Sequence, residues 1–411
     1  MHGDAAILFT AFEPSGDDHA SVVIAELKRR YPSLPIFAWG GPKMEAAGAK
    51  IIERTGDDAV MGMPGWKKIR EHQQMNRRID DWVRERKASG IPITVHVPTD
   101  SPAANFPICT ITKKYHAKVV HLVAPQIWAW GRWRIHKLRR LTDLVLCLLP
   151  FEKAFFERRE VPARFIGHML FDQAFDAATL AELDARAASF PQGRPRIAIM
   201  PGSRPDELRR HFPVLLDAFR ELRRRYPSCS GVVAATREPV AVNLRRVASE
   251  RGGWPEGLAI AVKDTDAIVR WCDLALVKSG TVTMQVAKQV RPMVIFYKKS
   301  NPIFFLLARS VLATKMFSLP NVIAGKRIVP ELVPHWGGPK RIVDEAVRII
   351  DDAEHAEAQR AAIREMLRKF DGMRTASLAA DAILEMAGLE KDPWAQASQR
   401  PPSSRSTSPV M

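Results

Sequence analysis

The chain has 411 residues, 46% hydrophobic and 26% charged, a balance typical of a globular protein long enough for two domains. Its net charge of +17 indicates an anionic partner: nucleic acid, an anionic bilayer or a phosphorylated substrate. The alternative is a basic surface that is simply solvated. Four widely spaced cysteines (Cys109, Cys147, Cys229 and Cys272) form no CxxC pair, which argues against a zinc site or a disulfide framework and fits a reducing cytosol.

We expect no signal peptide, because the first residues lack a basic segment, and no membrane-spanning helix, because no run of about 18 apolar residues exists. The most apolar stretch, Asn301–Thr314, is shorter than a span and contains Arg309. It is a candidate for lying at a membrane interface instead.

Short apolar segments alternate with helical patterns along the whole chain. In the first half, strands are expected at Ala5–Ala11, Pro35–Trp39, Ile91–Val97, Lys118–Val123 and Leu144–Leu149. In the second half, they are expected at Arg196–Met200, Gly231–Ala235, Leu258–Val262, Leu274–Val277 and Met293–Tyr297, with an amphipathic helix at Val214–Tyr226. This alternation predicts an α/β protein with parallel sheets covered by helices.

The two series of strands predict two successive Rossmann-like domains. The polar, alanine-rich segment Asp172–Gln192 separates them, so we place the first domain at residues 1–185 and the second at 190–370. Residues 391–411 are rich in Ser, Pro, Gln and Arg without apolar periodicity, which predicts a disordered tail.

Loops that directly follow strands are the candidate binding sites, because open α/β sheets bind ligands there. The first contains Ser15, Gly16 and Asp17. Gly16 permits a tight turn, and either polar side chain is suited to contact substrate. The plainer interpretation is that Ser15 or Asp17 caps the following helix.

The second loop contains Gly202, Ser203 and Arg204. Glycine lets the backbone approach a ligand, the hydroxyl can donate to it, and the guanidinium suits phosphate oxygens. A strand, this loop and a helix start together form a plausible diphosphate-binding site.

The third loop, Ser279, Gly280 and Thr281, again leads into a helix, where Gln285 is placed to reach a ribose hydroxyl. A fourth loop contains Asn321. Asp100 lies after another expected strand, on a loop stiffened by two prolines, where it is either a turn residue or a general base.

An aromatic and basic run extends from Trp128 to Arg140. Tryptophan with arginine suits stacking on nucleic acid or anchoring among lipid headgroups, and it is also compatible with a part-buried core segment.

Taken together, these loops resemble the lipid-A-disaccharide synthase family over roughly residues 5–390. The segments that carry the resemblance, in chain order, are EPSGD at Glu13–Asp17, GGPKM at Gly40–Met44, AVMGM at Ala59–Met63, VAPQIWAW at Val123–Trp130, TDLVLCLLPFEKAFF at Thr142–Phe156, RFIGH at Arg164–His168, MPGSR at Met200–Arg204, KSGT at Lys278–Thr281 and SLPN at Ser318–Asn321.

The resemblance implies a GT-B fold, with two Rossmann-like domains facing each other across a cleft and a C-terminal helix at 372–390 returning to the first. It implies that the first domain binds the acceptor and the second the UDP-sugar. The family transfers 2,3-diacylglucosamine from UDP to 2,3-diacylglucosamine 1-phosphate without a metal or other cofactor, and its catalytic aspartate corresponds to Asp100. The implied location is the cytoplasmic face of a bacterial inner membrane, with peripheral attachment to its anionic surface.

Three departures from the family pattern affect the expected substrates. Ala103 and Ala104 replace an acidic residue and a phenylalanine, and Pro98-Thr99 replaces Gly-Ile before the aspartate. Gln285 replaces a ribose-binding glutamate, which should weaken UDP binding by ~1–2 kcal/mol.

Three alternatives therefore stay open. The first is a GT-B glycosyltransferase with a different lipid or sugar acceptor, and the second is a UDP-GlcNAc 2-epimerase. The third, a nucleic-acid-binding protein, is suggested only by charge, and we expect no nucleic-acid partner because no recognised module is present.

Overall fold

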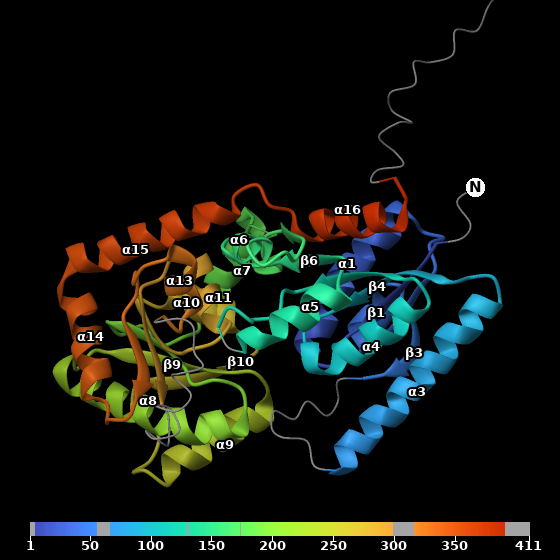
Figure 1. Ribbon diagram of the computed structural model, residues 1–411. Helices are drawn as coiled ribbons and strands as arrows, with labels where there is room; N and C mark the ends of the chain where they lie inside the picture. Colours follow the sequence, from blue (N-terminus) through green and yellow to red (C-terminus); the bar gives the residue numbers. More distant parts are fainter. Residues whose placement is uncertain (1–4, 56–65, 130, 173, 299–315, 391–411) are drawn as a thin grey trace, which may run out of the picture. The chain divides into compact units, whose positions relative to one another are not determined.

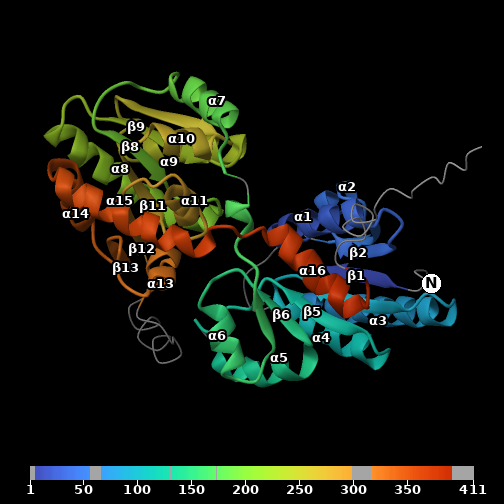
Figure 2. The ribbon, with the colours of Figure 1, turned by 90° about the horizontal axis from the view of Figure 1, so that it is seen from above.

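The computed structural model describes residues 5–55, 66–129, 131–172, 174–298 and 316–390 (Figure 1). The expected disordered tail from Lys391 lies outside these residues. The chain divides into two compact units, Met1–Asp172 with Gly372–Met411, and Gln173–Asp371 (Figure 2). Each unit contains one parallel sheet covered by helices, which confirms the expected α/β class.

The sheet of the first unit has seven parallel strands in the order β3-β2-β1-β4-β5-β6-β7. The order reverses between β1 and β4, where Leu8 pairs with His96. Ligands of open α/β sheets bind at such a reversal, outside the carboxyl ends of the strands. The strands are β1 (Ala6–Thr10), β2 (Ile36–Gly40), β3 (Lys50–Arg54), β4 (Ile93–Pro98), β5 (Lys118–Leu122), β6 (Leu144–Cys147) and β7 (Ala163–Phe165).

The helices of this unit bury apolar faces on both sides of the sheet. They are α1 (Pro14–Arg30), α2 (Pro42–Ala46), α3 (Trp66–Ala88), α4 (Pro102–Lys114), α5 (Ile135–Leu141), α6 (Glu152–Glu157) and α16 (Thr375–Ala387). The C-terminal α16 lies beside α1 (Figure 2), where the Arg30 guanidinium is 2.5 Å from an Asp381 carboxylate oxygen. The start of α16 is held by Asp172, whose carboxylate accepts two of its backbone N–H groups at 2.8 and 3.0 Å.

The sheet of the second unit has six parallel strands in the order β10-β9-β8-β11-β12-β13. They are β8 (Arg196–Met200), β9 (Ser230–Ala235), β10 (Leu258–Val262), β11 (Leu274–Lys278), β12 (Met293–Lys298) and β13 (Glu331–His335). The helices are α7 (Ala177–Ala187), α8 (Pro205–Arg225), α9 (Glu238–Ser249), α10 (Thr265–Trp271), α11 (Val282–Lys288), α13 (Leu319–Ala324), α14 (Lys340–Asp351) and α15 (Ala353–Leu367).

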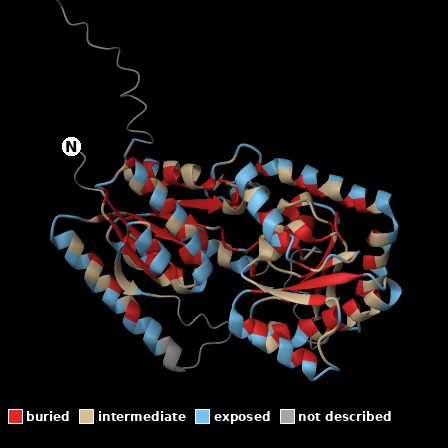
Figure 3. Cartoon of the chain, turned by 180° about the vertical axis from the view of Figure 1, so that it is seen from behind, coloured by how far each residue is buried: buried red, intermediate tan, exposed pale blue. Residues whose placement is uncertain are grey.

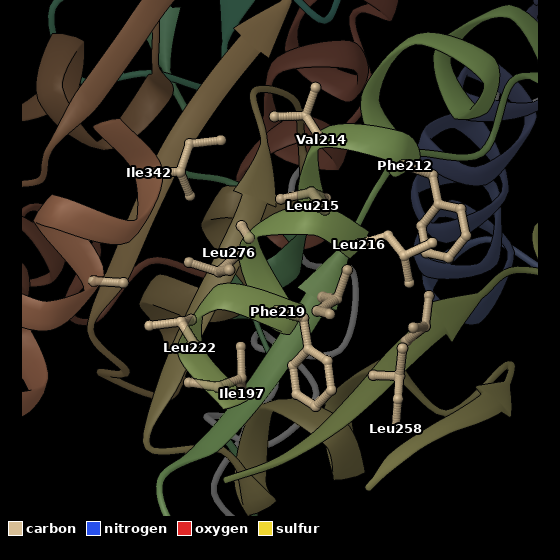
Figure 4. Close-up of a cluster of buried hydrophobic side chains, with 14 of the residues drawn as sticks. Ile197, Phe212, Val214, Leu215, Leu216, Phe219, Leu222, Leu258, Leu276 and Ile342 are labelled. Carbon is tan, nitrogen blue, oxygen red and sulfur yellow. The ribbon is translucent and has the colours of Figure 1, made fainter. Parts of the chain in front are cut away.

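The main core of the second unit forms where α8 packs on the sheet. Phe212, Leu215 and Phe219 of this helix are fully buried against Ile197 and Leu276 of the strands (Figure 4). Figure 3 shows the same pattern in each unit, since buried residues gather in the sheets and exposed ones on the outer helix faces. The rigid core fixes the loops at the carboxyl edge of the sheet.

The division between the units falls between Asp172 and Gln173, at the start of the segment Asp172–Gln192 that was expected to contain the boundary and before residue 185, where the first domain was expected to end. Most of this alanine-rich segment forms α7, which packs on α10 of the second unit. Asp184 of α7 lies 2.8 Å from the Arg270 guanidinium of α10. Helical propensity and this ion pair explain why the segment belongs to the second unit.

Candidate active site

Asp100 lies in a strained turn just after β4. Its φ is 52° and that of Ser101 is 35°, in the left-handed region where each non-glycine residue costs about 1–3 kcal/mol. Backbone bonds hold the turn, since the Asp100 N–H donates to the Leu122 carbonyl at 3.0 Å. The Asn105 amide donates to the Asp100 carbonyl at 2.9 Å. The half-buried Asp100 carboxylate has no hydrogen bond or ion pair with any described residue, so it is available to a substrate.

The first candidate loop lies beside this turn. The Ser101 hydroxyl donates to a Glu13 carboxylate oxygen at 2.9 Å, which joins the loop to the residue after Asp100. Gly16 is buried in α1, and a Cβ there would lie 3.1 Å from that of Ala11 and 3.5 Å from the Thr99 carbonyl oxygen. The close approach of helix and turn therefore favours glycine at this position. Ser15 is exposed in the first turn of the helix.

Asp17 has a different environment from the one expected of a substrate ligand. It is only 6% exposed, and its carboxylate accepts the backbone N–H groups of Gly41, Lys43 and Met44, each at 3.1 Å. These three donors lie at the start of α2. The carboxylate thus joins α1 to the loop after β2, and its acceptor capacity is largely used within the protein.

A histidine that the sequence analysis did not select lies in α1 near Asp100. His19 Nδ1 is 3.0 Å from the Met169 sulfur, and its ring centroid is 6.2 Å from that of His168. Burial lowers the pKa of His19, while the negative charges of Asp100 and Asp18 act in the opposite direction. Burial also lowers the pKa of His168 to about 4, so both rings favour the neutral form.

The second candidate loop forms the turn between β8 and α8. Gly202 has a φ of 104°, which only glycine adopts readily. Ser203 and Arg204 are exposed, and the Arg204 guanidinium is 3.5 Å from a Glu207 carboxylate oxygen. The loop therefore presents a hydroxyl and an exposed guanidinium at the carboxyl edge of the sheet.

Lys278 connects this loop to the third one. Its ammonium lies 2.8 Å from Glu207, and both side chains are 13% exposed. A Cβ on Gly202 would be 3.6 Å from the Lys278 Cδ, and a Cβ on Gly280 would be 3.4 Å from its Nζ. The lysine side chain therefore runs between the two glycine loops. Neither Lys278 nor Glu207 was among the expected site residues, although both lie within or next to the expected motifs.

The third candidate loop precedes α11. The Ser279 hydroxyl is 3.4 Å from the Phe317 carbonyl oxygen, and Thr281 is exposed. Gln285 is half-buried one turn into the helix. The structure thus brings the second and third loops together through Lys278, with Gln285 on the following helix.

Asn321 is fully buried and its amide is occupied by internal hydrogen bonds. Its oxygen accepts the N–H groups of Ile328 and Val329 at 2.8 and 3.0 Å. Its nitrogen donates to the Val329 carbonyl at 3.1 Å and to Glu331 at 3.0 Å. Glu331 also accepts from the Ser318 backbone and hydroxyl at 2.9 and 2.6 Å. These contacts show Asn321 as a residue that shapes its own loop.

The aromatic and basic run divides into a buried and an exposed part. Trp128, 9% exposed, packs on Phe151 and donates its indole N–H to Glu152 at 2.9 Å, so it is a core residue and not a surface anchor. Trp133 is 66% exposed, in a short 3-10 helix (Arg132–Arg134). The second expected surface, Ile303–Leu307, lies outside the described residues.

The described residues contain no group of three or more His, Cys, Asp or Glu side chains arranged to hold a metal ion. No helix among them is both long and apolar enough to cross a bilayer.

Comparison with known proteins identifies the family. The lipid-A-disaccharide synthetase family matches residues 7–383. A lipid-A-disaccharide synthase from Anaeromyxobacter dehalogenans is 36% identical, over 88% of this chain and 92% of its own length.

Solved structures share the fold. MnaA of S. aureus, in a co-structure with UDP, has a TM-score of 0.65 at 10% identity, covering 95% of this chain and 98% of its own. MurG of Acinetobacter baumannii has a TM-score of 0.56 at 12% identity, covering 93% and 99%. With two parallel-sheet units of this kind, the chain has a GT-B fold, is a glycosyltransferase and belongs to the lipid-A-disaccharide synthetase family.

Proposed function

We propose that the protein transfers 2,3-diacylglucosamine from UDP to the 6-hydroxyl of 2,3-diacylglucosamine 1-phosphate. The oxygen of this hydroxyl attacks the anomeric carbon of the donor, the bond from that carbon to the UDP oxygen breaks, and the configuration inverts. The products are the β-1,6-linked disaccharide of lipid A and UDP. The observation that carries this proposal is the family match over residues 7–383.

Asp100 is the proposed general base. Its carboxylate has no hydrogen-bond or ion-pair partner in the described part of the chain and lies at the carboxyl edge of the first sheet, beside the strand-order reversal. A base at this position accepts the proton of the attacking hydroxyl, and such catalysis typically contributes about 10²–10⁴-fold to the rate. The first unit would therefore bind the acceptor, with Ser15 and Gly16 beside the turn, while Asp17 would hold α1 to the start of α2.

The donor diphosphate is proposed to bind at the second and third loops. Arg204, the Ser203 hydroxyl and the Ser279–Thr281 loop supply donors to phosphate oxygens, and Lys278 adds a second cation. Two fixed positive groups stabilise the charge that develops on departing UDP. Gln285 would accept a hydrogen bond from a ribose hydroxyl, and Asn321 would keep its loop in shape.

We also propose peripheral binding to an anionic membrane, where acylated substrates reside. Exposed Trp133 and its exposed basic neighbours Arg132 and Lys137 support this proposal. Each such cation near an anionic surface contributes about 1 kcal/mol.

The test is incubation of the full chain with UDP-diacylglucosamine and the acceptor lipid, followed by mass analysis. Formation of the disaccharide with release of UDP supports the proposal. Transfer only to other sugars or lipids would indicate a changed acceptor, and isomerisation of UDP-GlcNAc without UDP release would indicate an epimerase.

Two variants test the residue roles, one through the turnover rate and the other through UDP affinity. Asp100→Ala should lower kcat by about 10²–10⁴-fold while UDP affinity, measured by calorimetry, changes little. Arg204→Ala should weaken UDP binding by about tenfold or more. Near-normal turnover of the first variant, or unchanged UDP affinity of the second, contradicts the assignment concerned.

A further inference from the structure

Four fully buried polar side chains lie beneath the Asp100 turn. Thr10 ends β1, His96 lies in β4, and Asn105 and Thr112 lie two turns apart in α4, all 0% exposed. Their contacts form one continuous series. Thr112 Oγ1 is 3.0 Å from His96 Nδ1, His96 Nε2 is 2.9 Å from Thr10 Oγ1, and Thr10 Oγ1 is 2.6 Å from Asn105 Oδ1. Buried polar groups without partners are costly, so the series stabilises each of its members.

The orientation of the Asn105 amide determines the direction of these bonds. Its nitrogen lies 3.2 Å from the Thr99 carbonyl oxygen and 2.9 Å from that of Asp100. Carbonyl oxygens only accept, so the NH₂ group must face them. The Asn105 oxygen therefore faces Thr10, and the single hydroxyl hydrogen of Thr10 must point to it.

This requirement propagates to the histidine. Because Thr10 has donated its hydrogen to Asn105, its oxygen can only accept from His96, so the ring carries its hydrogen on Nε2. Burial lowers the pKa of His96 to about 3, so the ring is neutral and its Nδ1 accepts. The hydrogen on that side must come from Thr112. Its hydroxyl oxygen lies 3.0 Å from Nδ1 and farther, at 3.2 and 3.3 Å, from the Ile108 and Cys109 carbonyl oxygens, which compete for the same hydrogen.

The series ends at the two peptide groups around the strained turn. Consecutive carbonyls, those of Thr99 and Asp100, converge on one amide group, while Asp100 and Ser101 are both left-handed at φ 52° and 35°. Rotation of the Asn105 amide would place its oxygen against both carbonyls. The direction of the buried bonds therefore affects the backbone conformation of Asp100, the proposed general base.

We propose that Thr112, His96, Thr10 and Asn105 form a positioning chain whose one-way hydrogen bonds hold the Asp100 turn and thereby place its carboxylate for proton abstraction. This inference rests on the proposed function of Asp100 as general base. The four residues touch no substrate and act through the turn. Displacement of a catalytic group by about 1 Å is enough to lower the rate by about 10²-fold.

The kinetic test uses Thr10→Val, which keeps the side-chain shape and removes the hydroxyl. We expect kcat to fall about 10–100-fold while KM for donor and acceptor stays within about threefold, because only the base is displaced. Thr10→Ser keeps the donor and should recover most of the activity. The matched control is Thr142→Val, since Thr142 is 5% exposed in the same unit and its hydroxyl donates to the Leu138 carbonyl, outside the Thr112-His96-Thr10-Asn105 series.

A second measurement does not depend on the reaction. Histidine ¹⁵N spectra of the full chain, with the His96 signals assigned from a His96→Gln variant, should show a hydrogen on Nε2 and none on Nδ1. They should also show no titration of this ring between pH 5 and 8, and loss of the tautomer preference in Asn105→Ala.

The outcomes separate the inference from the proposed function. An active protein in which Thr10→Val keeps its kcat, or in which Thr142→Val loses as much, overturns the positioning role while the function stands. A protein that forms no disaccharide overturns the proposed function. In that case the spectra still test the direction of the hydrogen bonds, because a hydrogen on Nδ1 of His96 overturns the directed chain.

Discussion

The Lys278 ammonium lies 2.8 Å from a Glu207 carboxylate oxygen, and each side chain is only 13% exposed. Removal of either member is costly, because the charge that remains loses its nearest partner in a poorly solvated site. Arg204 also approaches Glu207, at 3.5 Å. One acidic residue thus holds the two cations of the proposed diphosphate site.

Lys278→Met should weaken UDP binding about tenfold, because one of two fixed cations is lost, and lower the free energy of unfolding by about 3 kcal/mol. The double variant Lys278→Met with Glu207→Gln should recover stability without recovering UDP affinity. Calorimetry and denaturant unfolding measure the two effects. The control is Lys340→Met, where the lysine side chain is 84% exposed. Unchanged UDP affinity of Lys278→Met would exclude the lysine from the donor site.

Asp17→Ala should lower the free energy of unfolding by about 2–4 kcal/mol, because three backbone N–H groups, two of them in buried hydrogen bonds, lose a charged acceptor. UDP affinity should stay unchanged, since these bonds lie in the first unit. Asp18→Ala is the neighbouring control, with a side chain that is 52% exposed. If Asp17→Ala is as stable as the control but loses acceptor binding, the residue is a substrate ligand.

Glu152 should make stability depend on pH. Burial raises the pKa of its carboxyl from 4.5 to about 7, although the Trp128 indole and the Leu149 N–H both donate to it. The folded state then holds the proton between pH 4.5 and about 7 while the unfolded state releases it. The free energy of unfolding therefore falls as pH rises through this window, by as much as about 3 kcal/mol.

Glu152→Gln removes this titration. We expect the stability of the natural protein relative to this variant to decrease between pH 5 and pH 8, as measured by denaturant unfolding. Glu157→Gln, at a side chain that is 50% exposed, should show no such change. Parallel stability curves for the natural protein and Glu152→Gln would contradict the raised pKa.

Membrane binding should depend on Trp133 and salt. The full chain should float with anionic vesicles at low salt, and Trp133→Ser combined with Lys137→Ser should reduce the bound fraction several-fold. Because the Debye length is about 8 Å at physiological ionic strength, added salt should release the protein. A chain that stays with the soluble fraction on anionic vesicles at low salt contradicts docking.

The sequence predicted the central strands well, because a strand buried on both faces, such as β1 or β4, is a continuous apolar run. It missed β3, β7 and β13, which are outer strands with partly exposed residues and thus lack that signal. Helix α8 begins at Pro205, although its start was expected at Val214. The first turns were missed because most of their residues are polar. In each case partial exposure removed the pattern on which the prediction depended.

The sequence by itself determined that Asp100 follows a strand on a proline-flanked loop, and that glycine loops follow β8 and β11. Only the tertiary structure decided which polar groups are free. Asp17 and Asn321 are occupied by backbone partners, while the Asp100 carboxylate has none among the described residues. The partners of Thr10 and Lys278 lie 86 and 71 residues away in the chain, at His96 and Glu207. The order of the strands in each sheet brings such distant residues together, and no local sequence pattern encodes that order.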